Sequence, residues 1–227
     1  MPRTIDTVTI DPKIVGPKNL ASGPGFAPPR RDGNGGDGPE QPPKLPLAVY
    51  KIAMLTGLAA ILMMFMGLIS AFIVRGMATN WKPVVLPKTL WVSTLLLLAS
   101  SFTLVKARRA LAGENQAGYK RLLALTAALG VGFVWAQLAS WAQLAAQGVF
   151  LAGSPHSSFF YMFTGLHGVH ILGGLTALAW LVWNARQVPM TEYGVAKRRA
   201  LVDTASLYWH FMDGLWVCLF ALLLLWR

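Results

Sequence analysis

Two histidines within one strongly apolar stretch are the first residues in this sequence that could do chemistry. His167 and His170 lie in FFYMFTGLHGVHILGG, residues 159–174, with Tyr161 and Thr164 just before them. Polar side chains are costly in the hydrocarbon of a membrane unless they face protein, and glycines let a neighbouring helix come close. We therefore expect these histidines to lie on a helix that packs against other helices.

A second polar group occurs near the C-terminus, where His210 and Asp213 are three residues apart and so share one helical face. Counted from the inner ends of their apolar segments, His170 lies about 14 residues in and His210 about 10. At a rise of 1.5 Å per residue, their depths differ by about 6 Å. We expect the two histidines to meet in one polar layer.

Several chemistries use such residues. A b-type haem needs two axial ligands, which His210 with His170 or His167 would supply. A zinc, iron or copper site could be built from His167, His170, His210 and Asp213, although no HExxH motif is present. Intramembrane His and Asp also occur in proton relays, but the first three apolar segments contain no Asp or Glu.

The simplest alternative is a structural polar seam, in which hydrogen bonds between helices contribute about 0.6 kcal/mol each and specify one arrangement. In this interpretation no residue is catalytic and none binds a metal or cofactor. The residues assigned to the seam are Gln137, Trp141, Tyr161, Thr164, His167, His170, Tyr208, His210 and Asp213.

The composition indicates a membrane protein. Of the 227 residues, 55% are hydrophobic and 13% are charged, whereas soluble domains have about 25% charged residues. The net charge is +11, but the basic residues cluster between apolar segments instead of alternating with aromatics on one surface. That distribution argues against nucleic-acid binding.

Continuous apolar segments predict an all-α membrane protein with five transmembrane helices in a bundle. Each segment reaches the roughly 20 residues that a spanning helix needs, and none alternates as a barrel strand would. Residues 1–45 are rich in Pro and Gly and are expected to form a flexible extramembrane tail, ahead of a transmembrane domain at 46–227. The predicted spans are 47–74, 86–105, 122–149, 159–183 and 201–226.

The connections between segments predict the orientation. Most loop Lys and Arg lie in residues 106–121 and 186–199, and none lies in 152–158. Basic connections stay inside. The N-terminus is therefore expected in the cytoplasm and the C-terminus on the periplasmic or extracellular side of a bacterial cytoplasmic membrane.

Three motifs resemble subunit III of the haem–copper oxidases. TGLHGVHILGG (164–174) is similar to the family's TGxHGxHVxxG, and YWHFMDGLW (208–216) is similar to YWHFVDxxW. In the second span, LWVST (90–94), followed by Ser100 and Ser101, resembles LWxNTxxLLxSS. The resemblance covers about residues 50–227, in the short five-span form of the family.

The resemblance implies a non-catalytic subunit III of a bacterial terminal oxidase of the cytochrome c oxidase type, in aerobic electron transport. Such a subunit holds no haem or copper. It packs against the catalytic subunit I, which reduces oxygen to water with proton pumping, and subunit II and membrane lipids are further expected partners. A bound phospholipid is also expected, because the seven-span form of the family holds lipid in a cleft. The alternatives are an accessory subunit of a quinol oxidase or nitric oxide reductase, and a self-contained b-haem protein with His170 and His210 as ligands.

The sequence departs from the family pattern at buried acids. Ile61 stands where the family has glutamate in the first of these spans, and Ser140 replaces the glutamate of QxxEW. Asp203 stands where the family has glutamate near the start of the last span. The loss of two acids suggests that this subunit is mainly structural.

Overall fold

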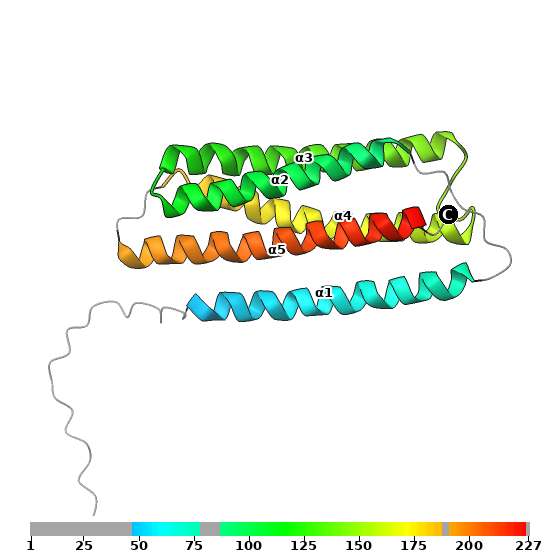
Figure 1. Ribbon diagram of the computed structural model, residues 1–227, viewed down its shortest axis with the longest axis horizontal. Coiled ribbons are helices and arrows are strands. Elements are labelled where there is room, and N and C mark those ends of the chain that lie inside the picture. The colour runs from blue at the N-terminus through cyan, green and yellow to red at the C-terminus, as the bar shows by residue number, and fades with distance from the viewer. Residues whose placement is uncertain (1–46, 78–86, 188–190, 226–227) are drawn as a thin grey trace, which may run out of the picture. The chain divides into compact units, whose positions relative to one another are not determined.

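The computed structural model describes residues 47–77, 87–187 and 191–225, and these form a bundle of five helices without a strand (Figure 1). In the described part of the chain, every helix is long and apolar enough to cross a membrane. The predicted fold class is therefore confirmed. The helices are α1 (Leu47–Gly76), α2 (Thr89–Ala112), α3 (Gln116–Ala146), α4 (Pro155–Asn184) and α5 (Glu192–Leu225).

Three helices extend by six residues or more beyond the predicted spans, at the ends that carry basic residues, while α4 begins four residues early at Pro155. α2 continues to Ala112 instead of ending at 105, α3 begins at Gln116 instead of 122, and α5 begins at Glu192 instead of 201. Lys and Arg lower hydropathy but are good helix formers, so apolarity marks only the membrane-embedded part of each helix. The predicted tail, 1–45, lies outside the described residues.

A tight turn joins α2 to α3 and makes them an antiparallel pair. The backbone N–H of Gly113 donates to the carbonyl of Arg109, and Glu114 adopts a φ of 59°, a left-handed conformation that is uncommon outside glycine. The side chain of Asn115 then accepts a hydrogen bond from the N–H of Gly118 at 2.9 Å. This cap satisfies one of the free donors at the start of α3.

Buried residues recur every seven positions along the central helices. This spacing is typical of helices that cross at about 20° with left-handed packing. It brings side chains of each helix repeatedly to the same neighbour. The buried sets include Leu90, Leu97, Leu104 and Leu111 on α2, Tyr119, Thr126, Phe133 and Ser140 on α3, and Phe160, His167, Gly174 and Leu181 on α4.

α1 lies at the edge of the bundle. It packs on α4 and α5 but not on α2 or α3, and Figure 1 shows it alongside α5. Its buried side chains are Leu58, Phe65 and Phe72, again seven apart. One row of buried side chains thus holds α1 against the bundle, while most of its surface is apolar and exposed.

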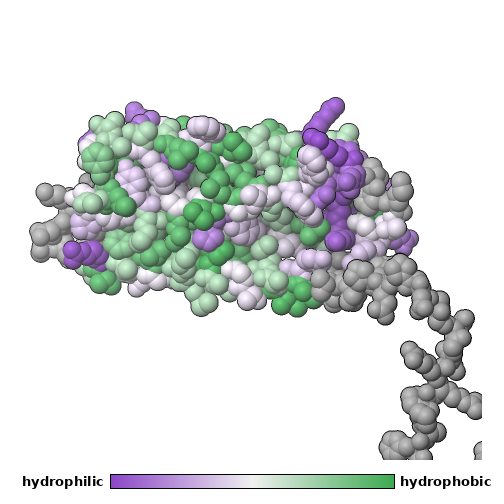
Figure 2. Space-filling view, turned by 180° about the vertical axis from the view of Figure 1, so that it is seen from behind, coloured by the Kyte–Doolittle hydropathy of each residue, from purple (hydrophilic) through white to green (hydrophobic). Residues whose placement is uncertain are grey.

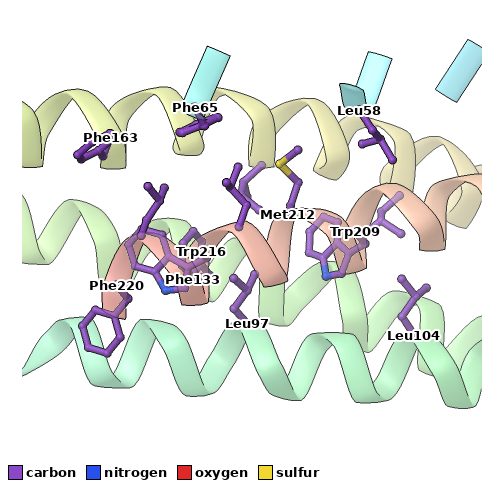
Figure 3. Close-up of a cluster of buried hydrophobic side chains, with 14 of the residues drawn as sticks. Leu58, Phe65, Leu97, Leu104, Phe133, Phe163, Trp209, Met212, Trp216 and Phe220 are labelled. Carbon is purple, nitrogen blue, oxygen red and sulfur yellow. The ribbon is translucent and has the colours of Figure 1, made fainter. Parts of the chain in front are cut away.

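α5 supplies the largest side chains of the core. Figure 3 shows Trp209, Met212 and Trp216 of α5 with Leu97 of α2 and Phe133 of α3, and all five are at most 1% exposed. On the face seen in Figure 2, apolar residues cover the middle of the bundle, and hydrophilic residues gather toward the end where α2 meets α3. This distribution suits a molecule surrounded by lipid.

Candidate functional site

Two tryptophans of α5 donate hydrogen bonds to hydroxyl groups of α2. The indole N–H of Trp216 reaches Oγ1 of Thr94 at 3.0 Å, and that of Trp209 reaches Oγ of Ser100 at 2.9 Å. All four residues are buried. Each hydroxyl also donates to a carbonyl of its own helix, at 2.8 Å and 2.6 Å, so the acceptors are held in position.

The same contact continues toward the basic end of α2. Oγ of Ser101 lies 2.5 Å from Nδ1 of His210. Further along, Nη2 and Nε of Arg108 donate to one carboxylate oxygen of Asp203 at 2.6 Å and 2.9 Å. Thr94, Ser101 and Arg108 are spaced by seven residues, so the polar contacts follow the same repeat as the apolar packing.

A second polar group joins α3 and α4. The indole N–H of Trp141 donates to Oγ1 of Thr164 at 3.1 Å, and the ring centroids of Trp141 and Tyr161 are 5.8 Å apart. The hydroxyl of Tyr161 donates to the carbonyl of Val149, just beyond α3, at 2.9 Å. These three members of the predicted seam are therefore brought together.

A third group joins α4 with α5 and α1. The hydroxyl of Tyr208 donates to the backbone carbonyl of His170 at 2.7 Å. The ring of His170 turns outward from α4, with Nδ1 2.7 Å from the carbonyl of Leu166 and with Phe65 of α1 5.9 Å away in an edge-on arrangement.

His167 is enclosed by aromatic rings. Its ring centroid lies 5.0 Å from that of Trp216 and 5.9 Å from that of Phe133. Its two nitrogens are buried without a hydrogen-bond partner among the described residues, as are the amide of Gln137 and the carboxylate oxygens of Asp213. The closest approach of Asp213 to His210 is 4.0 Å, from Oδ2 to Nδ1, which is too long for a hydrogen bond.

The geometry separates the two histidines that the sequence analysis paired. Among the described residues, His170 and His210 have no contact with each other, because one ring faces α1 and the other faces α2. No cluster of three His, Cys, Asp or Glu able to hold a metal occurs in the described ranges. Ser101 and Asp213 both approach Nδ1 of His210, whereas a nucleophile triad uses both ring nitrogens.

Residue-by-residue reasoning missed the hydroxyl groups of α2. Besides Thr94, Ser100 and Ser101, the pair Thr103 and Thr126 joins α2 to α3 with 2.8 Å between the hydroxyl oxygens. The sequence signal was available in the two tryptophans of α5, which are seven residues apart, and in the hydroxyl residues that bind them on α2, which are six residues apart. Their pairing, however, depends on the register between the two helices.

The two positions that lack the family's acids are occupied by residues without unpaired polar atoms. Ser140 is buried, its hydroxyl lies 2.7 Å from Oγ1 of Thr89 on α2, and it donates to the carbonyl of Ala136 at 2.9 Å. Ile61 packs against the apolar core. Neither position leaves a charge to be neutralised within the bundle.

The helices are long enough to span a membrane, and indole, hydroxyl and imidazole groups join them to one another. These features define an integral membrane protein. Residues 49–227 match the family model described as cytochrome c oxidase subunit III. The chain therefore belongs to the cytochrome c oxidase subunit III family.

Curated relatives agree with this assignment. The chain is 31% identical over 170 residues to cytochrome c oxidase subunit 3 of Synechocystis sp., covering 71% of this chain and 69% of that protein. It is 32% identical over 180 residues to the probable cytochrome c oxidase subunit 3 of Mycobacterium bovis, covering 77% and 87%. A more partial match, 33% over 134 residues, covers 59% of this chain and 63% of subunit 3 of the cytochrome bo(3) ubiquinol oxidase of Pseudomonas putida.

These matches favour the subunit III interpretation over the alternatives. The name shared by the family and by the relatives with the longer matches is that of a cytochrome c oxidase subunit. Neither a quinol oxidase or nitric oxide reductase accessory subunit nor a self-contained b-haem protein is favoured. The chain is thus a membrane protein of a family of respiratory oxidase subunits.

Proposed function

We propose that this chain is the non-catalytic subunit III of a bacterial terminal oxidase of the cytochrome c oxidase type. In this role it packs against the catalytic haem–copper subunit I, alongside subunit II, and stabilises the complex that reduces oxygen to water and pumps protons. The observation that carries the proposal is the family match, which extends through α1 to α5.

The contacts of the polar side chains support a structural role. The seam residues Trp141, Tyr161 and Tyr208 each donate a hydrogen bond to another helix or to the loop beside it, and such bonds specify one arrangement of helices. Haem and copper then belong to the partner subunits, and none of the seam residues serves as a ligand.

The charge distribution supports an orientation with the N-terminus in the cytoplasm. The turn between α2 and α3 is flanked by Arg108, Arg109, Lys120 and Arg121, and Figure 1 places the start of α5 at the same end of the bundle. Basic connections remain on the cytoplasmic side of a bacterial membrane. The C-terminus of α5 would then lie at the periplasmic or extracellular face.

A bound phospholipid forms part of the same proposal. An apolar cavity of about 380 Å³ opens between α1, α4 and α5 and is lined by residues that include Met54, Gly174, Trp180 and Tyr208. A cavity of this size and polarity suits an acyl chain. Lipid extraction from the purified complex, followed by mass spectrometry, would identify the lipid.

The experiment that tests the function is affinity purification through a tag on this chain in mild detergent. We expect a haem- and copper-containing subunit to co-purify and the preparation to consume oxygen with reduced cytochrome c. The chain purified alone should show no Soret band. A Soret band in the isolated chain, or purification without any haem protein, would contradict the proposal.

A further inference from the structure

A stripe of side chains on α5 is left uncovered between α1 and α2. Both helices pack on α5 but not on each other, and Figure 1 shows α5 between them. The stripe consists of Leu207, His210, Gly214 and Val217, whose spacing of three and four residues places them on one helical face. Leu207 is 40% exposed and Val217 is 42% exposed.

The stripe carries a polar group deep in the hydrocarbon. His210 follows Leu201, where the apolar part of α5 begins, by nine residues, or about 14 Å at 1.5 Å per residue. This depth is close to the middle of a hydrocarbon core of about 30 Å. Its side chain is 35% exposed. While Nδ1 contacts Ser101, no described residue makes a hydrogen bond to Nε2.

An acyl chain cannot satisfy that nitrogen, because hydrocarbon has no hydrogen-bonding group. Lipid headgroups lie at the membrane surface, about 15 Å from the middle of the core. A polar side chain at this depth is therefore expected to face protein. Since α1 and α2 flank His210 without a hydrogen bond to Nε2, a group from another polypeptide is the partner that suits this nitrogen.

Gly214, one turn beyond His210, leaves room for that polypeptide. A Cβ atom placed on Gly214 would meet no atom within 4 Å. Small residues beside polar ones are typical of close helix contacts in membranes. Toward Leu207, at the other end of the stripe, a cavity of about 340 Å³ is lined by His210 together with Lys51, Arg108 and Asp203. Charged groups are therefore available there to an incoming chain.

We propose that the α5 stripe is the docking surface for a transmembrane helix of another subunit of the oxidase. The partner helix presents a hydrogen-bonding side chain to Nε2 of His210 and crosses close to the backbone at Gly214. An acidic side chain at the end of the partner helix that lies nearest Leu207 would suit Lys51. This inference rests on the proposed function, because it assumes assembly with other membrane subunits.

The first test fills the space at Gly214. Gly214→Leu has room within this chain but would clash with a docked helix. We expect it to lower the amount of this chain retained per haem, when the catalytic subunit carries the tag, by about tenfold. The matched control is Gly67→Leu. Gly67 is equally open and follows the buried Phe65 by about 200° around α1, so it faces away from the bundle and should retain wild-type stoichiometry.

The second test identifies what covers the stripe. The photoreactive residue p-benzoylphenylalanine is placed at Val217, which is 42% exposed, and separately at Val131 on α3, which is 46% exposed. Illumination of membranes should cross-link position 217 to another polypeptide, identified by mass spectrometry. Position 131 should yield lipid adducts, because α3 lies on the other side of the bundle core from the stripe.

Retention of Gly214→Leu at wild-type stoichiometry, or lipid adducts alone at position 217, would overturn the docking surface. Either result would leave the proposed function intact, since co-purification of the wild-type chain with a haem protein tests that separately. Equal helicity and membrane content of both glycine variants are checked first. If the Gly214→Leu chain failed to accumulate in the membrane, that would also contradict the proposal, because it would mean that a side chain at this position clashes within the chain.

Discussion

The indole of Trp209 lies directly against the backbone of Gly130, across the contact between α5 and α3. A Cβ atom on Gly130 would come within 2.9 Å of the Trp209 ring and within 2.8 Å of a methyl carbon of Leu175. Because Gly130 has no side chain, the indole of Trp209 can occupy the space where a Cβ atom would lie. From this position Trp209 also reaches Ser100 on α2, so one side chain connects α5 to two helices.

We expect Gly130→Ala to destabilise the bundle although alanine favours helix. Overpacking costs about 1–3 kcal/mol, which outweighs a gain in helix propensity of up to about 1 kcal/mol. Gly132→Ala is the matched control, because its Cβ would meet only a methyl carbon of Leu96 at 3.6 Å. Unfolding in mixed detergent micelles should show a lower free energy for the first variant and an unchanged or higher one for the second.

The hydroxyl of Ser100 is expected to contribute more than its neighbour Ser93. Ser100→Ala leaves the indole N–H of Trp209 unpaired and should lower the free energy of unfolding by about 0.6–1.7 kcal/mol. Ser93 is equally buried but donates only to the carbonyl of Leu90 on its own helix. Ser93→Ala should therefore change the free energy by less than about 0.5 kcal/mol. Equal losses would mean that the indole bond contributes nothing.

Replacement of the histidines should leave the haem content of the complex unchanged. His167 has unpaired nitrogens and packs against Trp216 in a tilted arrangement. Because His167→Phe keeps an aromatic ring, its free energy of unfolding is expected within about 1 kcal/mol of the wild-type value. His210→Ala removes the Ser101 contact and should loosen this subunit in the complex. The Soret absorbance of the purified oxidase measures the haem content for both variants. Loss of that absorbance would contradict the structural interpretation.

The ion pair between Arg108 and Asp203 should contribute little to stability. Their side chains are 41% and 42% exposed, and exposed pairs typically contribute about 0–1 kcal/mol. A double-mutant cycle with Arg108→Gln and Asp203→Asn should give a coupling free energy in that range. The coupling should shrink in about 1 M salt, where the screening length falls to about 3 Å. A large, salt-independent coupling would instead indicate that the pair is buried in the assembled oxidase.

The number of helices could be predicted because a spanning helix is long and continuously apolar. The ends of α2, α3 and α5 could not, since helical structure continues past the membrane into residues such as Lys106, Arg121 and Lys197. Hydropathy reports where a residue is stable in lipid. It does not report where the backbone hydrogen bonds of the helix stop.

The candidate site was predictable in part. His167, His170 and His210 were identifiable because polar residues are conspicuous in apolar segments, but their surroundings were not. Although His167 and His170 are three residues apart, one ring lies between α3 and α5 while the other faces α1. Partners such as Ser101, more than one hundred residues from His210, depend on the register between helices, which no local spacing determines.

α2 divides its hydroxyl groups between two neighbours, Thr89 and Thr103 bonding to α3 and Thr94 and Ser101 approaching α5. One residue inserted after Thr94 would rotate the rest of α2 by about 100° and turn Ser101 and Arg108 away from α5 together. Residues inserted at the Gly113 turn lie beyond all these contacts. Insertions and deletions should therefore be tolerated at that turn, whereas within α2 they should prevent folding. The residue spacing along α2 thus sets the register of both α3 and α5 in the bundle.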